Sequence, residues 1–148
     1  MTSGGGGWFE DFEPGDFFRH ARGKTVTEMD GVLLTNLVLN TAQAHFNEDV
    51  MRASGGTIVF GGVVAAMVIG LATQDTAENA VRELGLDELR FKAPVHHGDT
   101  LYAYTEVLGR EDSDRGDGGV VHFRHRGANQ DGVEVFECRR SVLVRRRA

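Results

Sequence analysis

The stretch TIVFGGVVAAMVIGLA, residues 57–72, is the longest apolar run in the chain. It is shorter than the roughly 20 apolar residues that a membrane-spanning helix needs. It also contains three glycines, at positions 61, 62 and 70. An apolar segment of this kind is typical of a buried helix of a soluble domain. We therefore expect a buried helix over about 61–75 and no segment in a membrane.

The residues before this run predict one strand and two helices. We expect an edge strand at 17–26, a helix at 28–38, a turn through 39–46, a short helix at 47–52 and a turn at 54–56. Thr27, with Asp30 three residues later, resembles a capping box at the start of the first helix. Asn47 suits the cap of the short helix, and the acids Glu48 and Asp49 in its first turn suit the helix dipole.

After residue 78 the pattern becomes that of about four antiparallel strands. One ends near Pro94, and the others are expected at 100–111, 120–129 and 133–146, with turns at 96–99, 112–119 and 130–132. In the second of these strands, alternate residues share one face: Leu101, Ala103, Thr105 and Val107. An apolar helix backed by a meander-like antiparallel sheet is an α+β fold. Such a sheet leaves apolar surface uncovered, so we expect a homodimer or a higher homo-oligomer.

Length and composition fit one ordinary domain. The chain has 148 residues, of which 41% are hydrophobic. The net charge of −6 gives no electrostatic reason to expect nucleic-acid binding. Cys138 is the only cysteine, which excludes an internal disulfide and a zinc-type motif and indicates a cytoplasmic protein without a metal site. The glycine-rich start lacks the features of a signal peptide, so we expect a flexible tail at 1–7 and one domain at 8–148.

Three stretches together resemble a known family. They are WFEDFEPGDFFRHARGKTVTEMD at 8–30, LRFKAPVHHGDTLYAYTEVL at 89–108 and HRGANQDGVEVFECRRSVLV at 125–144. In this order they are similar to the MaoC-like dehydratase and (R)-specific enoyl-CoA hydratase family, most of all to its mesaconyl-CoA hydratase (methylmalyl-CoA dehydratase) branch. The resemblance implies a single hotdog fold, in which an antiparallel sheet wraps a long central helix. It also implies an acyl-CoA thioester substrate, with coenzyme A as part of the substrate and no separate cofactor.

The segment LNTAQAHFNED, residues 39–49, corresponds to the catalytic stretch of the family, which typically reads G-D-x-N-P-x-H. The histidine of that pattern falls on His45, and its aspartate falls on Asn40. The resemblance therefore implies that His45 transfers the proton and that Asn40 orients the water. Asparagine cannot exchange a proton at neutral pH, but it can hold a water by hydrogen bonds. On its own, the segment would equally suit a polar loop with a histidine in it, and Glu48 and Asp49 would be substitute acids or only helix-dipole partners.

The sequence VFGG, 59–62, opens the long helix. The unpaired backbone N–H groups of a helix N-terminus suit a developing oxyanion, and glycine lets a thioester approach closely. By the resemblance, Gly61 is the oxyanion donor and Gly62 lies beside it. The alternative is that both glycines only let the helix and the sheet pack tightly.

The remaining polar residues carry weaker signals. His96 and His97 form a turn pair without metal-ligand spacing. His20, His122 and His125 lie beside arginines and are expected at the surface. The basic end RRSVLVRRR, 139–147, would suit coenzyme A phosphates or a solvated strand end.

We therefore expect a hydratase or dehydratase that acts on a 2-enoyl-CoA thioester, with a branched dicarboxylic ester such as mesaconyl-CoA as one candidate. One alternative is a hotdog thioesterase, but no acid occurs between 57 and 74, and only Asp75 and Glu78 lie near the far end of the helix. The other is a non-catalytic acyl-CoA-binding or structural subunit, for which the loss of the usual aspartate at Asn40 would be an argument.

Overall fold

The computed structural model describes residues 7–114 and 116–148, so the expected flexible tail lies, except for Gly7, outside the described residues. The helices are α1 (Glu28–Leu37), α2 (Glu48–Met51) and α3 (Gly61–Thr76), with 3-10 turns at Phe9–Asp11, Gln43–His45 and Arg52–Ser54. The strands are β1 (Phe17–Thr25), β2 (Ala80–Phe91), β3 (Thr100–Asp112), β4 (Gly118–Ala128) and β5 (Glu134–Arg145). The predicted α+β order of one strand, three helices and four strands is confirmed.

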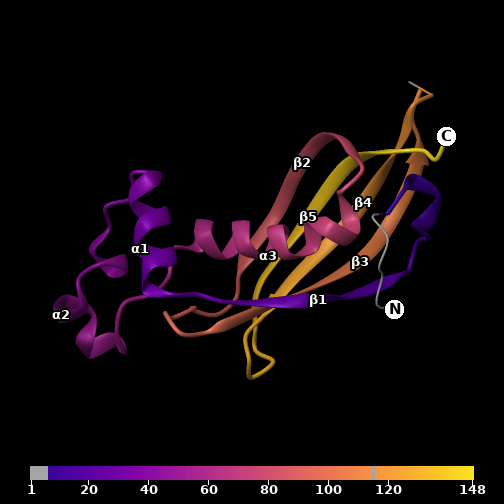
Figure 1. Ribbon diagram of the computed structural model, residues 1–148. Coiled ribbons are helices and arrows are strands. Elements are labelled where there is room, and N and C mark those ends of the chain that lie inside the picture. The colour runs from indigo at the N-terminus through magenta and orange to yellow at the C-terminus, as the bar shows by residue number, and fades with distance from the viewer. Residues whose placement is uncertain (1–6, 115) are drawn as a thin grey trace.

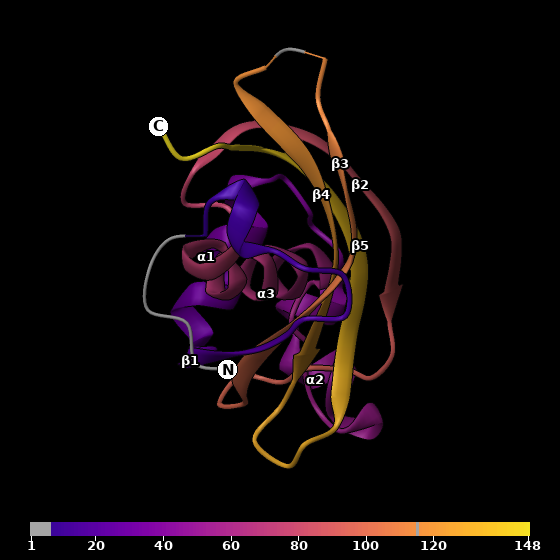
Figure 2. The same ribbon diagram turned by 90° about the vertical axis from the view of Figure 1, so that its right-hand side faces the viewer.

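The five strands form one antiparallel sheet in the order β1-β3-β4-β5-β2. The strand expected at 17–26 is an edge strand, as predicted. The expectation of a simple meander is only partly right, because β2 does not pair with β3 but with β5 at the opposite edge. The curved sheet wraps around α3, which runs along its inner face (Figures 1 and 2). This is the arrangement that the family resemblance implied.

The central helix is buried along one side, where its residues are apolar and one strand lets it approach closely, and it is exposed at Gly62, Ala66, Gly70 and Gln74. Val63, Val64, Val68 and Ala72 are among its buried side chains. A Cβ atom at Gly127 of β4 would lie only 2.4 Å from Cγ2 of Val68, so the helix packs directly on the strand backbone there. The strand residues that were expected to share one face of β3 are all buried, which confirms the predicted alternation.

A second, aromatic core closes the end of the sheet away from α1 and α2. The N-terminal segment inserts Phe9 and Phe12 against Phe18 of β1 and Phe123 of β4. The rings of Phe12 and Phe123 meet edge to face with centroids 5.1 Å apart, a favoured aromatic geometry. The segment that resembles the family at 8–30 thus forms part of the core.

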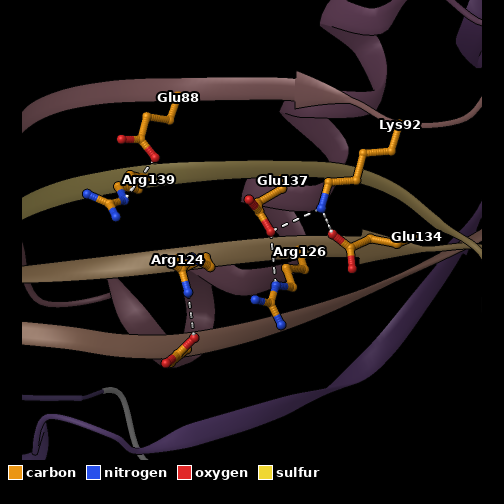
Figure 3. Close-up of polar contacts among 8 residues, drawn as sticks. Glu88, Lys92, Arg124, Arg126, Glu134, Glu137 and Arg139 are labelled. Atoms are coloured by element: carbon orange, nitrogen blue, oxygen red, sulfur yellow. Dashed lines mark hydrogen bonds and ion pairs between the residues drawn. The ribbon is translucent and has the colours of Figure 1, made fainter.

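The outer face of the sheet, which points away from α3, carries a lattice of ion pairs (Figure 3). Its pairs are Arg124–Glu106, Arg126–Glu137, Lys92–Glu137, Lys92–Glu134 and Arg139–Glu88. Exposed pairs of this kind contribute little stability, but their charges keep this face of the sheet solvated. Within the described residues, no helix is long and apolar enough to cross a membrane.

Two histidines that were expected at the surface are buried, so that expectation was wrong. His20 of β1 is 3% exposed and His125 of β4 is 0% exposed. His125 shares the inner face with Phe123, since residues two apart on a strand point the same way. Both rings are held by hydrogen bonds to side chains on other elements. His122, whose side chain is 39% exposed, agrees with the expectation.

Candidate active site

The segment that holds His45 projects beyond one end of the sheet, beside the N-terminus of α3 (Figure 1). It begins with α1, where Thr27 and Asp30 form the predicted capping box. The side chain of Lys24, then the backbone N–H and the hydroxyl of Thr27, donate to the carboxylate of Asp30 and lower its pKa to about 2. The expected turn at 39–46 contains the 3-10 turn that ends at His45, and α2 follows with its predicted Asn47 cap.

His45 is oriented by the residues that lead into α3. Its Nδ1–H donates to the carbonyl oxygen of Ile58 at 2.8 Å. A carbonyl can only accept, so Nδ1 carries the proton in the neutral ring and Nε2 keeps its lone pair. The ring is half-buried and lies beside Phe60, with centroids 5.5 Å apart. A histidine with a free, unprotonated Nε2 is suited to act as a general base.

Asn40 lies five residues before His45, and its hydrogen bonds are with residues close to it in the sequence. Its backbone N–H donates to the carbonyl of Thr35, and its side-chain Oδ1 accepts from the backbone N–H of Ala42 at 3.1 Å. The second bond identifies the side-chain oxygen, because its partner is a donor. The amide therefore uses its oxygen to shape the turn and leaves its NH₂ group to donate.

Glu48 and Asp49, the possible substitute acids, have structural contacts. Glu48 accepts from the backbone N–H of Thr57 at 3.1 Å, and the hydrogen bonds from Thr57 lower the pKa of Glu48. A carboxyl with a lowered pKa is a poorer proton donor at neutral pH. Asp49 pairs with Arg52 one turn along at the exposed surface. Glu48 thus connects α2 to Thr57, the residue next to Ile58, whose carbonyl orients His45.

The N-terminus of α3 opens toward a groove. Phe60, the residue before the helix, supplies no side-chain cap, and its carbonyl accepts from the N–H groups of Val63 and Val64. The earlier amides, of Gly61 and Gly62, belong to the first turn, whose N–H groups have no intrahelical acceptor. A Cβ atom at Gly61 would lie 2.9 Å from the ring of Phe91. A larger residue there would crowd the wall of the groove.

The groove has a volume of about 530 Å³ and is mostly apolar. It is lined by Ile58–Gly62 and Val64, by Phe91–Val95 and by Val135. Lys92 is the only charged side chain among the described residues that line it, and its ammonium is paired with Glu134 and Glu137. Apolar walls beside free backbone donors are typical of a small-molecule site.

The far end of α3 carries a different polar cluster, which bears on the thioesterase alternative. Oδ2 of Asp75 lies 2.6 Å from Nδ1 of His20, and Nε2 of that ring lies 2.7 Å from Oγ1 of Thr105. The connectivity is that of an acid–histidine–hydroxyl triad. Thr105 is fully buried, however, so a thioester cannot reach its hydroxyl. The cluster therefore gives the thioesterase alternative no support.

The residues that line the groove include neither His45 nor Asn40, and the other histidines and arginines singled out in the sequence do not gather there either. His97 packs against α1 at Gly31, where a Cβ atom would lie 2.4 Å from its Nε2. Arg140 is buried in an ion pair with Glu83, and Arg147 pairs with Asp11. Burial raises the pKa of the Cys138 thiol to about 11, as expected of an unreactive core cysteine.

Sequence reasoning missed two parts of this site. The first is Ile58, which orients His45 through its backbone carbonyl, a group that carries no sequence signal. The second is the ring of Phe91, which reaches the groove from the edge strand β2. Its position depends on strand pairing that the sequence does not specify.

Comparisons with known proteins identify the family of the chain. The chain matches the family described as mesaconyl-CoA hydratase over residues 5–146. It is 34% identical to the mesaconyl-CoA hydratase of Cereibacter sphaeroides over 149 residues, which cover 99% of this chain and 43% of that protein. The chain thus spans less than half the length of this relative.

Solved structures share the fold. A MaoC domain dehydratase from Chloroflexus aurantiacus superposes with a TM-score of 0.89 at 32% identity and covers 100% of this chain and 43% of its own. A Mycobacterium tuberculosis protein with a double hotdog fold superposes with a TM-score of 0.86 at 25% identity, over 96% of this chain and 45% of its own. The sheet around α3 is therefore a hotdog fold, and the chain belongs to the mesaconyl-CoA hydratase family.

Proposed function

We propose that the protein is a hydratase or dehydratase that adds water to, or removes it from, a 2-enoyl-CoA thioester. The observation that carries the proposal is the hydrogen bond from Nδ1 of His45 to the carbonyl of Ile58, which leaves Nε2 as a base beside the N-terminus of α3. The names of the relatives, a hydratase and a dehydratase, support the same reaction in its two directions.

In this proposal His45 moves the proton in both halves of the reaction. Its Nε2 takes a proton from water, and the hydroxide oxygen adds to the β carbon of the enoyl thioester. The electron pair of the double bond moves to the thioester oxygen, where the N–H of Gly61, with Gly62 beside it, stabilises the enolate. The proton on Nε2 then passes to the α carbon. Asn40 holds the water by donating from its NH₂ group, since its oxygen is occupied.

The acyl group is proposed from the relatives. A branched dicarboxylic substrate such as mesaconyl-CoA is favoured by the printed function of the curated relative. Coenzyme A is part of such a substrate, and the reaction needs no metal or separate cofactor. The apolar groove suits the hydrocarbon part of the acyl chain.

We further propose that the protein acts as a homodimer or a higher homo-oligomer. The edge strand β2 exposes five apolar side chains, each between 38% and 55% accessible: Val81, Leu84, Leu86, Leu89 and Phe91. An apolar strand with an unpaired edge is a surface that another chain covers. The single buried cysteine favours a cytoplasmic location.

One assay tests the function. The purified full chain is given crotonyl-CoA and, separately, mesaconyl-CoA, and both the enoyl-thioester absorbance and free thiol are followed. Loss of absorbance without thiol supports hydration, and hydration of mesaconyl-CoA in preference to crotonyl-CoA supports the dicarboxylic substrate. Thiol release would instead identify a thioesterase. Binding of both esters without turnover would identify a non-catalytic subunit.

A further inference from the structure

A row of polar side chains crosses all five strands of the sheet. Each strand supplies one of them, in the order of the sheet: His20 from β1, Thr105 from β3, His125 from β4, Arg140 from β5 and Glu83 from β2. The first four are buried. Buried polar groups are costly unless they are bonded, so a row of this length needs an acceptor for each donor.

One half of the row is a continuous chain of hydrogen bonds that begins on α3. Oδ2 of Asp75 lies 2.6 Å from Nδ1 of His20, and Nε2 of that ring lies 2.7 Å from Oγ1 of Thr105. The same hydroxyl oxygen lies 2.8 Å from Nδ1 of His125. A carboxylate only accepts, so Nδ1 of His20 carries a proton that points to Asp75.

The other half ends in an ion pair at the sheet edge. Nε and Nη2 of Arg140 donate to Glu83 at 2.9 and 2.7 Å. Among the described residues, two buried side-chain atoms have no partner, Nη1 of Arg140 and Nε2 of His125. His125 lies opposite Cys138 in the pairing of β4 with β5, which makes Arg140 its diagonal neighbour on the same face.

The position of the proton on His125 decides whether its Nε2 can accept a hydrogen bond from the direction of Arg140. Burial lowers the pKa of His125 to about 3, so the ring is neutral and has a single N–H. With that proton on Nε2, two buried donors would face each other. With the proton on Nδ1, Nε2 is an acceptor that matches the N–H of Arg140. Nδ1–H then donates to Thr105, whose one hydroxyl proton is left to donate to His20.

We propose that a single buried water joins Nη1 of Arg140 to Nε2 of His125 and completes a hydrogen-bond chain whose donors all point from Arg140 toward Asp75. The water accepts from the guanidinium and donates to the ring, which are the two bonds that the site requires. An anion is a poorer occupant, because Glu83 already balances the charge of Arg140.

The direction of the chain also agrees with its end charges. It starts at a cation and ends at a carboxylate, so the bond dipoles are aligned with the field between them. Through Asp75 and Glu83 the chain links the C-terminal part of α3 with both edge strands of the sheet. It lies apart from His45 and does not depend on the proposed reaction.

The tautomers of the two rings test the direction. Long-range ¹H–¹⁵N spectra of the full chain, labelled with ¹⁵N-histidine, report which ring nitrogen carries the proton. At neutral pH both His20 and His125 should carry it on Nδ1, whereas an unrestrained histidine favours Nε2. A proton on Nε2 of His125 would overturn the proposal, and this measurement on the natural protein needs no variant.

Two variants and one structure complete the test. Thr105→Val keeps the shape of the side chain but removes the hydroxyl that accepts from Nδ1 of His125, so the ring of His125 should lose its fixed tautomer. The ring of His20 should keep its proton on Nδ1, because Asp75 is still present, and Thr105→Ser should retain both tautomers. An unchanged tautomer of His125 in the folded valine variant would contradict the chain. A high-resolution crystal structure should show a water within hydrogen-bond distance of Arg140 Nη1 and His125 Nε2. A chloride, recognised by its anomalous signal, or a direct contact would overturn the water.

Discussion

His45 donates from Nδ1 to the carbonyl oxygen of Ile58, a residue of the segment that leads into α3, at 2.8 Å. One backbone group thus determines both the tautomer and the direction of the ring. Because Ile58 lies three residues before Gly61, the same short segment positions the proposed base and the proposed oxyanion donor. The geometry of the two groups is therefore set by a continuous piece of backbone rather than by flexible side chains.

The variant His45→Gln separates the chemical role of this residue from its structural one. The amide of the introduced glutamine would be able to donate to the carbonyl of Ile58, but it cannot take up a proton. We expect turnover of the enoyl-CoA substrate to fall by at least about 10²-fold, with the melting temperature unchanged. His45→Ala serves as the comparison, since it loses both roles. Turnover of the folded glutamine variant near the natural rate would exclude His45 as the base.

The variant Asn40→Asp tests whether an acid restores the pattern of the family. An aspartate can still accept from the N–H of Ala42, so the turn is kept, and its second oxygen becomes available for proton transfer. The carboxylate cannot donate to the water as the NH₂ group does, but it can accept a hydrogen bond from the water and take its proton. We therefore expect an increase in kcat, for which a single acid–base group can supply about 10²-fold. Asn40→Ala, which loses the bond to Ala42, controls for the shape of the turn. Reduced turnover in a folded Asp variant would show that the amide itself is required.

The variant Gly61→Ala should impair the reaction because its added methyl group crowds the groove. Alanine keeps the backbone N–H group, so the proposed oxyanion donor is not lost. The added Cβ lies 2.9 Å from the ring of Phe91, at the groove. We expect a loss of kcat/KM for the enoyl-CoA ester. Gly70→Ala is the matched control on the same helix, because no atom lies within 4 Å of its Cβ and alanine favours the helix by about 1 kcal/mol. Equal kinetics for the two variants would argue against Gly61.

Local sequence patterns predicted the helices and strands well, because the residues that favour a helix or a strand lie within it or next to it. The long helix was expected at 61–75 and spans Gly61–Thr76, and the capping box at Thr27 is present. The edge position of β2 next to β5 was not predicted, since strand pairing at a distance leaves no mark in a single sequence. The burial of His125 was missed because neighbouring arginines suggested a surface strand, although its spacing from Phe123 indicated the inner face.

The candidate site was predicted in part, for a related reason. The family pattern pointed to His45, and the structure brings that ring to the N-terminus of α3. The pattern did not reveal that Oδ1 of Asn40 is already bonded to Ala42, because that bond depends on the backbone of the turn. The pairing of His20 with Asp75, 55 residues away, likewise results from the fold rather than from a local motif.

The contact between Gly127 and Val68 predicts a packing defect. A Cβ atom at residue 127 would lie 2.4 Å from Cγ2 of Val68, so Gly127→Ala would push α3 away from β4. We expect the free energy of unfolding in urea to fall by about 1–3 kcal/mol. Val68→Ala in the same chain should recover part of that loss by vacating the space. Gly109→Ala is the control, because its Cβ meets no atom within 4 Å; an equal loss there would point to strand glycines in general.

The burial of His125 predicts a specific loss of stability in acid. Burial, followed by the charge of Arg140, lowers the pKa of His125 from 6.5 to about 3. Below pH 6.5 the unfolded chain therefore binds a proton that the folded protein does not bind. The folded state should lose about 1.4 kcal/mol per pH unit from this residue as the pH falls from 6.5 toward 3, and nothing above 6.5.

The variant His125→Gln isolates this effect, because all carboxyl groups are shared with the natural protein. At pH 7 the variant should be the less stable protein, since it disturbs a buried hydrogen bond to Thr105. Its disadvantage should shrink as the pH is lowered to 4.5, measured as the free energy of unfolding in urea. His122→Gln, on the same strand but with a partly exposed side chain, controls for the loss of a histidine as such. Parallel pH profiles for the natural protein and His125→Gln would mean that His125 ionises without unfolding, and that the interior around it admits a charge.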